Sequence, residues 1–307
     1  MTKLKPFVFA ACEPLGFGIV EDLLTCKKLK DQVECVGSGV LDGSRKNELE
    51  KMGAEVVQYK EDDLSSVKDC LKKANCAIVI VHEHKRGFEM AGEMMKETMN
   101  AGIKHVKLIS LMNADKTPNE SHLKKFCSLE EIYEKSKFEG AIIRCGMYTD
   151  LLIHSSKSIR DNGELKLNLG EGKVAPIAKC EVSYFVACAL VKYHGKADTE
   201  KKFVTVCLTG NKLRNGKEIA KRISEAIDND VEYKEVEKDE MKRILKDQDL
   251  SEHHIQCIVD VLEIGKNNHF DKTSDIYKEV TGEEPKGIKH FIDQNGDSFK
   301  PKKSQYY

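Results

Sequence analysis

Three polar residues have the types and spacing that proton-transfer catalysis requires. Tyr133 precedes Lys137 by four positions, and a phenol beside an ammonium group can act as a general acid of lowered pKa. Ser110, at the end of an apolar run, would complete the group. Because a lysine-rich chain is expected to contain such a match on the order of once by chance, we favour a solvated helix face as the interpretation of Tyr133 and Lys137.

The second candidate is the first turn of the chain, which is placed like a turn that binds the phosphates of a dinucleotide. An apolar strand runs into a turn of small residues and then into an amphipathic helix. Three glycines usually make the turn tight, let the pyrophosphate approach the backbone and pack helix on strand. Here those positions are Ala10, Glu13 and Gly16. A carboxylate at position 13 would face the phosphate charge at a helix N-terminus that otherwise favours anions.

Histidine and cysteine offer weaker candidates. His82 and His84 flank one glutamate at a strand end, but no third ligand has a spacing typical of a metal site. We therefore expect no metal, and place His82 at the rim of a cleft. Cys12 is the leading redox candidate because it precedes a helix N-terminus, although the neighbouring Glu13 opposes thiolate formation.

These residues must be positioned by alternating strands and helices. The first half of the chain predicts continuous apolar strands, each followed by an amphipathic helix. This alternation is typical of a doubly wound parallel sheet, an α/β fold with helices on both faces. The predicted strands cover 7–11, 33–41, 55–58, 77–81, 106–111 and 141–144, and the helices 16–26, 45–52, 64–73, 88–101 and 128–137.

The pattern changes after Gly146, and we place the boundary between a core (1–150) and a second lobe (151–307) just beyond it. The strand at 203–208 is expected to return to the core sheet. An extended piece is predicted over 165–169. The rest of the lobe is expected to be mainly helical, with helices over 182–191, 218–227, 239–246, 254–264 and 287–295.

Composition limits the classes of function. The chain has 307 residues and a formal net charge of -1, which gives no electrostatic argument for binding nucleic acid or an acidic membrane. Its eleven cysteines include no Cys-x-x-Cys pair, its longest apolar runs have the length of strands, and no signal peptide is evident. These features favour reduced thiols and a cytoplasmic location.

Several short motifs, in order, resemble the NmrA-like family of atypical short-chain dehydrogenases, and within it the type-2 quinone oxidoreductases. The segment 53–58 followed by Asp62 and Asp63 resembles the family's third strand and the helix cap after it. The sequence Ala-Ile-Ile-Arg-Cys-Gly at 141–146 resembles its sixth strand. The segments 173–181, 208–210, 218–220, 281–285 and 291–292 resemble later elements.

The resemblance implies a Rossmann core with a small C-terminal lobe and a cleft between them. It also implies that several cofactor contacts have changed. Leu41 stands where NADPH-binding relatives carry arginine, although Arg45 matches a second basic position; Lys60 replaces an aspartate beside the adenine. Phe126 replaces the helix lysine beside the nicotinamide ribose, whereas Ser110 agrees with the family.

Two functions follow as expectations. The first is a protein that binds NADP or NAD weakly or not at all and acts, like NmrA-like regulators, on a protein partner or through a small ligand in the cleft. The alternative is an NAD(P)H-dependent reductase of a quinone or small carbonyl compound; a purely structural role has no positive sign. The predicted cofactor-binding positions are Ala10, Cys12, Glu13, Leu15, Gly16, Leu41, Arg45, Lys60, His82 and Ser110.

Overall fold

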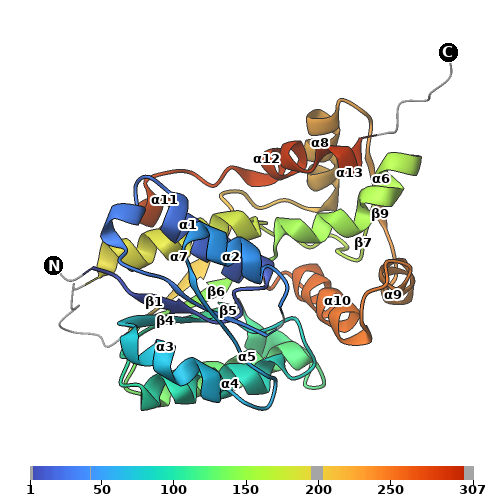
Figure 1. Cartoon of the computed structure of the whole chain (residues 1–307). Helices are drawn as coiled ribbons and strands as arrows, with labels where there is room; N and C mark the ends of the chain where they lie inside the picture. Colours follow the sequence, from blue (N-terminus) through green and yellow to red (C-terminus); the bar gives the residue numbers. More distant parts are fainter. Residues whose placement is uncertain (1–2, 42, 195–202, 301–307) are drawn as a thin grey trace.

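The core of the protein is a seven-stranded parallel sheet in the order β3-β2-β1-β4-β5-β6-β8 (Figure 1). A computed structural model describes residues 3–41, 43–194 and 203–300. The predicted doubly wound α/β fold is confirmed. The strands are β1 (Pro6–Val8), β2 (Gly37–Val40), β3 (Glu55–Gln58), β4 (Cys76–Val79), β5 (His105–Leu111), β6 (Glu139–Cys145) and β8 (Phe203–Leu208).

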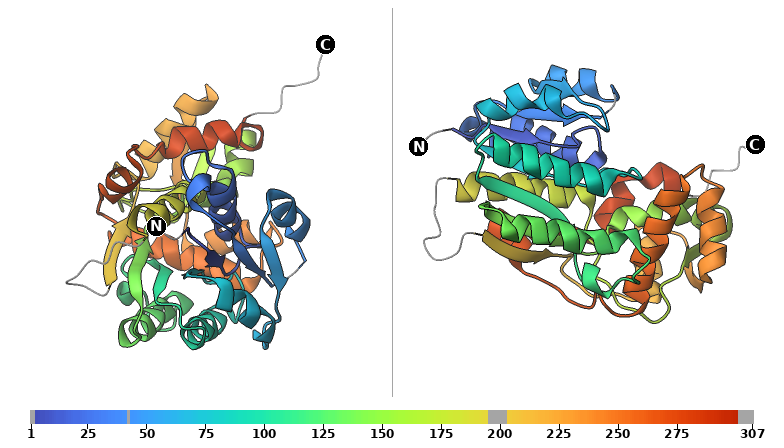
Figure 2. Two further views of the ribbon diagram at one scale, coloured as in Figure 1. Left: turned by 60° about the vertical axis from the view of Figure 1, so that its left-hand side comes forward. Right: turned by 90° about the horizontal axis from the view of Figure 1, so that it is seen from below.

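Helices cover both faces of this sheet, as Figures 1 and 2 show. One face packs against α1, α2, α7 and α11, and the other against α3, α4 and α5. The strand order reverses between β1 and β4, which is where dinucleotides bind in folds of this kind. The helices are α1 (Pro14–Thr25), α2 (Lys46–Met52), α3 (Lys68–Lys73), α4 (Gly87–Asn100), α5 (Lys125–Lys135), α7 (Lys179–Tyr193) and α11 (Ile276–Thr281).

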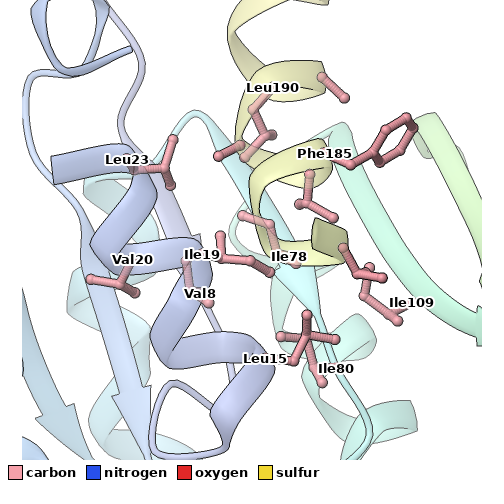
Figure 3. Packing of buried hydrophobic residues seen from close by; sticks show 14 of the residues in the cluster. Val8, Leu15, Ile19, Val20, Leu23, Ile78, Ile80, Ile109, Phe185 and Leu190 are labelled. Atoms are coloured by element: carbon pink, nitrogen blue, oxygen red, sulfur yellow. The ribbon is translucent and has the colours of Figure 1, made fainter. Parts of the chain in front are cut away.

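Helices α1 and α7 pack side by side on the sheet (Figure 3). Leu15 and Ile19 of α1 and Phe185 of α7 are buried in one apolar cluster with Ile78 and Ile109 of the strands. Burying one such side chain stabilises the fold by about 1.5–3 kcal/mol. This packing fixes helix α1, and with it the turn that precedes the helix, relative to the sheet.

A second apolar cluster joins the helices after residue 150 to residues that follow β5 and β6, among them Met112, Leu123 and Met147. The same part of the chain, which we call the C-terminal lobe, contains a two-stranded parallel sheet of β7 (Glu164–Leu167) and β9 (Glu232–Glu235). Strand β7 overlaps the segment 165–169 that is predicted to be extended. Strand β9 was not predicted, because its sequence Glu-Tyr-Lys-Glu has no apolar alternation. The helices of this lobe are α6 (Ser156–Asn162), α8 (Gly216–Ile227), α9 (Lys238–Lys246), α10 (Glu252–Lys266), α12 (Gly287–Gln294) and α13 (Gly296–Phe299).

Some element boundaries differ from those expected, for local reasons. The predicted strand at 33–41 begins only at Gly37, because Lys30–Gln32 form a 3₁₀ turn and Val33 makes an isolated bridge to Leu4. Helix α7 begins three residues early, where the Glu181 carboxylate accepts a hydrogen bond (3.1 Å) from the N–H of Ala178. Within the described residues no helix is both long and apolar enough to cross a bilayer.

Candidate functional site

The first turn joins β1 to helix α1 and carries Ala10, Glu13 and Gly16, the positions expected to be glycines in a phosphate-binding turn. Ala10 adopts the left-handed conformation (φ 53°) that glycine favours, a strain of about 1 kcal/mol or more. A Cβ atom on Gly16 would lie 2.2 Å from the carbonyl oxygen of Ala10. Gly16 is therefore required by the close approach of helix α1 to the turn.

The N-terminus of α1 has few donors left for an anion. Its first residue is Pro14, which has no N–H, and Glu13 at the N-cap position makes no capping hydrogen bond. The N–H of Phe17 already bonds to the carbonyl of Glu13 (2.9 Å). The amides of Leu15 and Gly16 are the first-turn donors that remain to meet a negative group.

The Glu13 carboxylate turns toward the end of β4. Its Oε1 atom lies 3.1 Å from Nδ1 of His82 and accepts the N–H of Glu83 at 3.3 Å. The other ring nitrogen of His82, which is 2% exposed, is hydrogen-bonded to the hydroxyl of Tyr59. Tyr59 follows β3 and His82 follows β4, so this Tyr59–His82–Glu13 chain crosses the switch point of the sheet.

The residues expected at the adenine end, Leu41, Arg45 and Lys60, do not line the cavity that lies above β4, β5 and β6. Leu41 is partly buried against the core, and the guanidinium of Arg45 lies 4.6 Å from the ring centre of Phe17. Lys60 is exposed, with its backbone paired to Asp63. Cys12 is partly buried against the apolar cluster beneath the turn.

A cavity of about 310 Å³, which we call the interlobe cavity, lies between the ends of β4, β5 and β6 and helix α10. Its walls are mainly apolar. Phe126, at the position where the resemblance expects lysine, lines this cavity and packs edge-on against Phe88 at 4.9 Å. The neighbouring Lys125 pairs with Glu89 instead (3.1 Å). Among the lining residues are Leu15, Ile109, Leu123, Ile153, Ile258 and Val261.

Charged and titratable groups also line this cavity, and we call four of them the charged cluster: Glu83, Lys179, His254 and Asp150. Glu83 pairs with Lys179 (2.8 Å) and with His254 (3.6 Å). Burial acts to raise the pKa of Glu83, but the ion pair and hydrogen bond with Lys179, together with the nearby His254 and His154, outweigh it, so the pKa lies below its usual value. Asp150 accepts the N–H of Lys179 (2.9 Å), and burial raises its pKa.

A second polar group supports the floor of the cavity. Ser110 is buried at the end of β5 and donates to Oε1 of Glu130 (2.6 Å). The Nε of Arg144 bonds to both oxygens of Glu130 (2.9 and 3.1 Å), and Arg144 lies opposite Ser110 in the β5–β6 register. The Ser110 hydroxyl therefore donates to a carboxylate rather than to the cavity. Sequence reasoning missed Glu130; an arginine closing an apolar strand was the available signal.

The structure does not bring Tyr133 and Lys137 to Ser110. Tyr133 is fully buried beneath the sheet, and its hydroxyl donates to the carbonyl of Val106 (2.7 Å). Val106 is four residues before Ser110 on the same strand, a separation of about 13 Å. Burial raises the pKa of Tyr133 well above its usual value. The solvated-face interpretation is wrong for Tyr133, whereas Lys137 is exposed.

Helix α10 supplies residues that the sequence placed in the fold but not in the site. His253 and His254 lie at the N-terminus of a helix, as predicted, where Ser251 caps the N–H of His254 (3.2 Å). Both also line the cavity together with Cys257. Burial raises the pKa of the Cys257 thiol to about 12, so it is not a reactive thiolate at neutral pH. Within the described parts of the chain, no group of three or more His, Cys, Asp or Glu side chains could hold a metal ion.

Comparison with known proteins places these features in a family. A model described as the NmrA-like family matches residues 41–304, which confirms the predicted resemblance. Prestalk A differentiation protein A of Dictyostelium discoideum is 19% identical over 203 residues, 65% of this chain and 62% of that protein. The match therefore spans less than two thirds of that relative's length.

Solved structures share the fold over almost the whole chain. Triphenylmethane reductase of Citrobacter sp. with NADP(H) has a TM-score of 0.79 at 18% identity, covering 95% of this chain and 99% of that one. The NADPH-dependent quinone oxidoreductase of Escherichia coli with NADPH also has a TM-score of 0.79, at 16% identity (95% and 99%). NmrA, a negative transcriptional regulator with NAD, has a TM-score of 0.71 at 11% identity (96% and 95%).

Proposed function

Because this chain belongs to the NmrA-like family of NAD(P)-binding Rossmann folds, we propose that it is a member that acts by binding a small apolar ligand in the interlobe cavity, with weakened affinity for NAD(P). The observation that carries the proposal is the Tyr59–His82–Glu13 chain across the switch point. As they stand, these residues do not fit a pyrophosphate.

Electrostatics gives the expected size of the effect. A carboxylate held about 5 Å from a phosphate charge is repelled by on the order of 3 kcal/mol at the effective dielectric of a protein surface. That corresponds to roughly a hundredfold in affinity. The changes at Leu41 and Lys60 add to this loss, because neither side chain offers the contact that the family resemblance expects there.

The cavity supports the second half of the proposal. Its size is at the lower end of the range for small-molecule sites, roughly 300–1,000 Å³, and such sites combine apolar walls with a few polar groups. The apolar side chains of β5, α5 and α10 would hold the body of a ligand. The ammonium of Lys179 lies beside the ring of Tyr148 (5.7 Å) and could meet a hydroxyl or an acidic group on the ligand.

A first experiment tests the weakened dinucleotide site by calorimetric titration with NADPH, NADP⁺, NADH and NAD⁺. We expect millimolar or weaker binding by the natural chain, and a gain of about tenfold or more in Glu13→Gly, which removes the carboxylate. Glu21→Gln, on the exposed side of the same helix, removes one charge as the control. Micromolar binding by the natural chain would contradict the proposal.

Micromolar binding of a dinucleotide would favour the alternative function, an NAD(P)H-dependent reductase. One observation supports this alternative. The uncapped amides of Leu15 and Gly16 remain at the N-terminus of α1, and a small rotation of Glu13 would leave them open to a phosphate. The next step would then be a screen of quinones and small carbonyl compounds for oxidation of NADPH.

A second experiment tests the cavity with the apolar dye anilinonaphthalene sulfonate, whose fluorescence rises in apolar sites. Val261→Trp fills the cavity wall and is expected to reduce dye binding about tenfold. Ile132→Trp makes the same change at a position that is 39% exposed and should leave binding unaltered. If the two variants reduced dye binding equally, the dye would not be bound in the cavity. That result would contradict a ligand-binding role of the cavity, and the search would turn to protein partners.

A further inference from the structure

A second hollow lies in the C-terminal lobe, apart from the interlobe cavity. It measures about 250 Å³ and is formed by the turn and helix after β8, by the start of α12 and by Pro176. Helices α8 and α12 are in contact and lie side by side in Figures 1 and 2. None of the residues lining this hollow lines the interlobe cavity.

Cationic side chains dominate this hollow, which we call the basic hollow. No carboxylate is among its lining residues, although the chain as a whole carries a net charge of -1. The positive charge is therefore a local concentration and does not reflect the overall composition. The cations are Lys212, Arg214, Arg222, Lys286 and Lys289.

Neighbouring carboxylates neutralise only part of this charge. Arg222 pairs with Glu225 (2.5 Å) and Lys289 with Asp293 (3.2 Å). These exposed pairs within single helices are worth only a few tenths of a kcal/mol. Across residues 3–41, 43–194 and 203–300, no carboxylate lies within 4.0 Å of the charged groups of three other lining residues: Lys212, Arg214 and Lys286.

Arg214 is the most constrained of these cations. Its backbone N–H and carbonyl bond to Val174 (2.8 and 3.0 Å), which fixes its position. Burial lowers the pKa of Arg214, and the nearby charge of Arg222 lowers it further, against the opposing effect of Glu218 and Glu225. Arg214 and Arg222 both line the basic hollow, and an anion bound there would relieve the repulsion between their charges.

The remaining wall is also held in place before any ligand binds. The N–H of Lys286 donates to Oε1 of Glu181 in α7 (2.5 Å), and the side-chain amide of Asn211 donates to the carbonyl of Pro285 (3.5 Å). These bonds tie the start of α12 to the core and to the turn after β8. The backbone that carries these cations is therefore fixed, and only their side chains lose freedom when an anion binds.

We propose that the basic hollow binds a small phosphorylated anion carrying two or more phosphate charges. Guanidinium groups present paired donors that match phosphate oxygens, and the lysines add point charges. The volume is below the roughly 300–1,000 Å³ typical of larger ligands. The proposal does not depend on the function proposed for the interlobe cavity.

The test is calorimetric titration with pyrophosphate, and with vesicles of phosphatidylcholine containing phosphatidylinositol bisphosphate. We expect micromolar binding that weakens as salt rises. Lys212→Gln/Lys286→Gln, which changes two exposed side chains, should reduce the affinity about tenfold or more, and Arg214→Gln should do the same. Lys30→Gln/Lys96→Gln removes the same charge from exposed positions elsewhere and should have no effect.

Each outcome decides the question. Binding of pyrophosphate identifies a free phosphorylated molecule, whereas binding to the vesicles alone identifies a lipid headgroup. Equal weakening by the control pair means unspecific attraction and overturns the proposal, as does the absence of binding to both probes. Circular dichroism melting of every variant shows that the fold is intact, and unaltered binding of the dye to the interlobe cavity separates this result from the proposed function.

Discussion

The two halves of the crevice above the sheet differ in what they offer a ligand. Over β1, β2 and β3, where the adenine half of a dinucleotide would lie, Leu41, Arg45 and Lys60 line no part of the interlobe cavity. Over β4, β5 and β6 there is an apolar cavity of about 310 Å³ with the charged cluster in its wall. The Glu13–His82 pair lies at the boundary between the halves.

This difference indicates that backbone architecture and ligand chemistry are separable in a Rossmann fold. The course of the first turn is constrained because α1 must pack on the sheet, whatever binds above it. Side chains that point into the crevice have no such packing constraint. They can therefore change without loss of the fold.

The largest expected effect tests the packing constraint in the first half. Gly16→Ala places a Cβ atom 2.2 Å from the carbonyl oxygen of Ala10, a backbone atom that cannot move aside. We expect it to lower the free energy of unfolding by about 3 kcal/mol, measured by urea denaturation. Gly43→Ala has no atom within 4 Å of the new Cβ and should change stability by less than about 1 kcal/mol. Similar values for the two variants would show that the turn does not depend on glycine.

The next effect concerns the floor of the second half. Arg144→Leu leaves the buried carboxylate of Glu130 without its cation. The free energy of unfolding should fall by about 2 kcal/mol, less than the roughly 3–5 kcal/mol for a fully buried pair, because the Arg144 side chain is 38% exposed.

Chemical denaturation provides the measurement for this pair. Arg222→Leu, which breaks the exposed pair with Glu225, is the control and should cost about 0.5 kcal/mol or less. If Arg144→Leu is no worse than this control, the Ser110–Glu130–Arg144 group does not support the cavity.

The stability of the protein should depend on pH in opposite directions through two carboxylates, Asp22 and Glu83, because their pKa values are shifted in opposite directions. Asp22 of α1 accepts a hydrogen bond from Ser183 (2.8 Å), and burial raises its pKa to about 6. Its contribution to stability is present below the unfolded pKa of about 3.9 and is lost as the pH rises through about 6. Asp22→Asn should remove this decline, so that above pH 7 the variant is more stable than the natural chain by about 1–2 kcal/mol. Thermal melts of both proteins from pH 4 to about 8 provide the measurement. The same change of melting temperature with pH in both proteins would contradict this prediction.

The smallest effect is expected at Glu83 in the cavity wall. Although burial acts to raise its pKa, the ion pair with Lys179 keeps that pKa below the usual value, so its contribution is present at neutral pH and is lost as the pH falls through the folded pKa. Glu83→Gln should destabilise the protein by about 0.5 kcal/mol at pH 7, since the side chain is 40% exposed. The difference should vanish in acid. Glu89→Gln, which breaks the exposed pair with Lys125, should produce a smaller change.

Sequence reasoning succeeded where local patterns and sheet geometry coincide. Apolar runs such as 77–81 predict the parallel strands, and the strand, turn and helix at the start of the chain occur in the predicted order. It failed for Tyr133, because a Tyr-x-x-x-Lys spacing carries no information on which side of the sheet the phenol lies. It also missed β9, whose charged residues become a strand only by pairing with β7.

The sequence by itself determined the order of the elements, the layers of the fold and the family, because periodicity and turn residues act over short distances along the chain. Only the tertiary structure decided the direction of the Glu13 side chain, the joining of Ser110 to Glu130 and Arg144, and the place of α10 against the cavity. Those features depend on contacts between residues that are far apart in sequence, such as Glu13 and His82, and no local pattern encodes them.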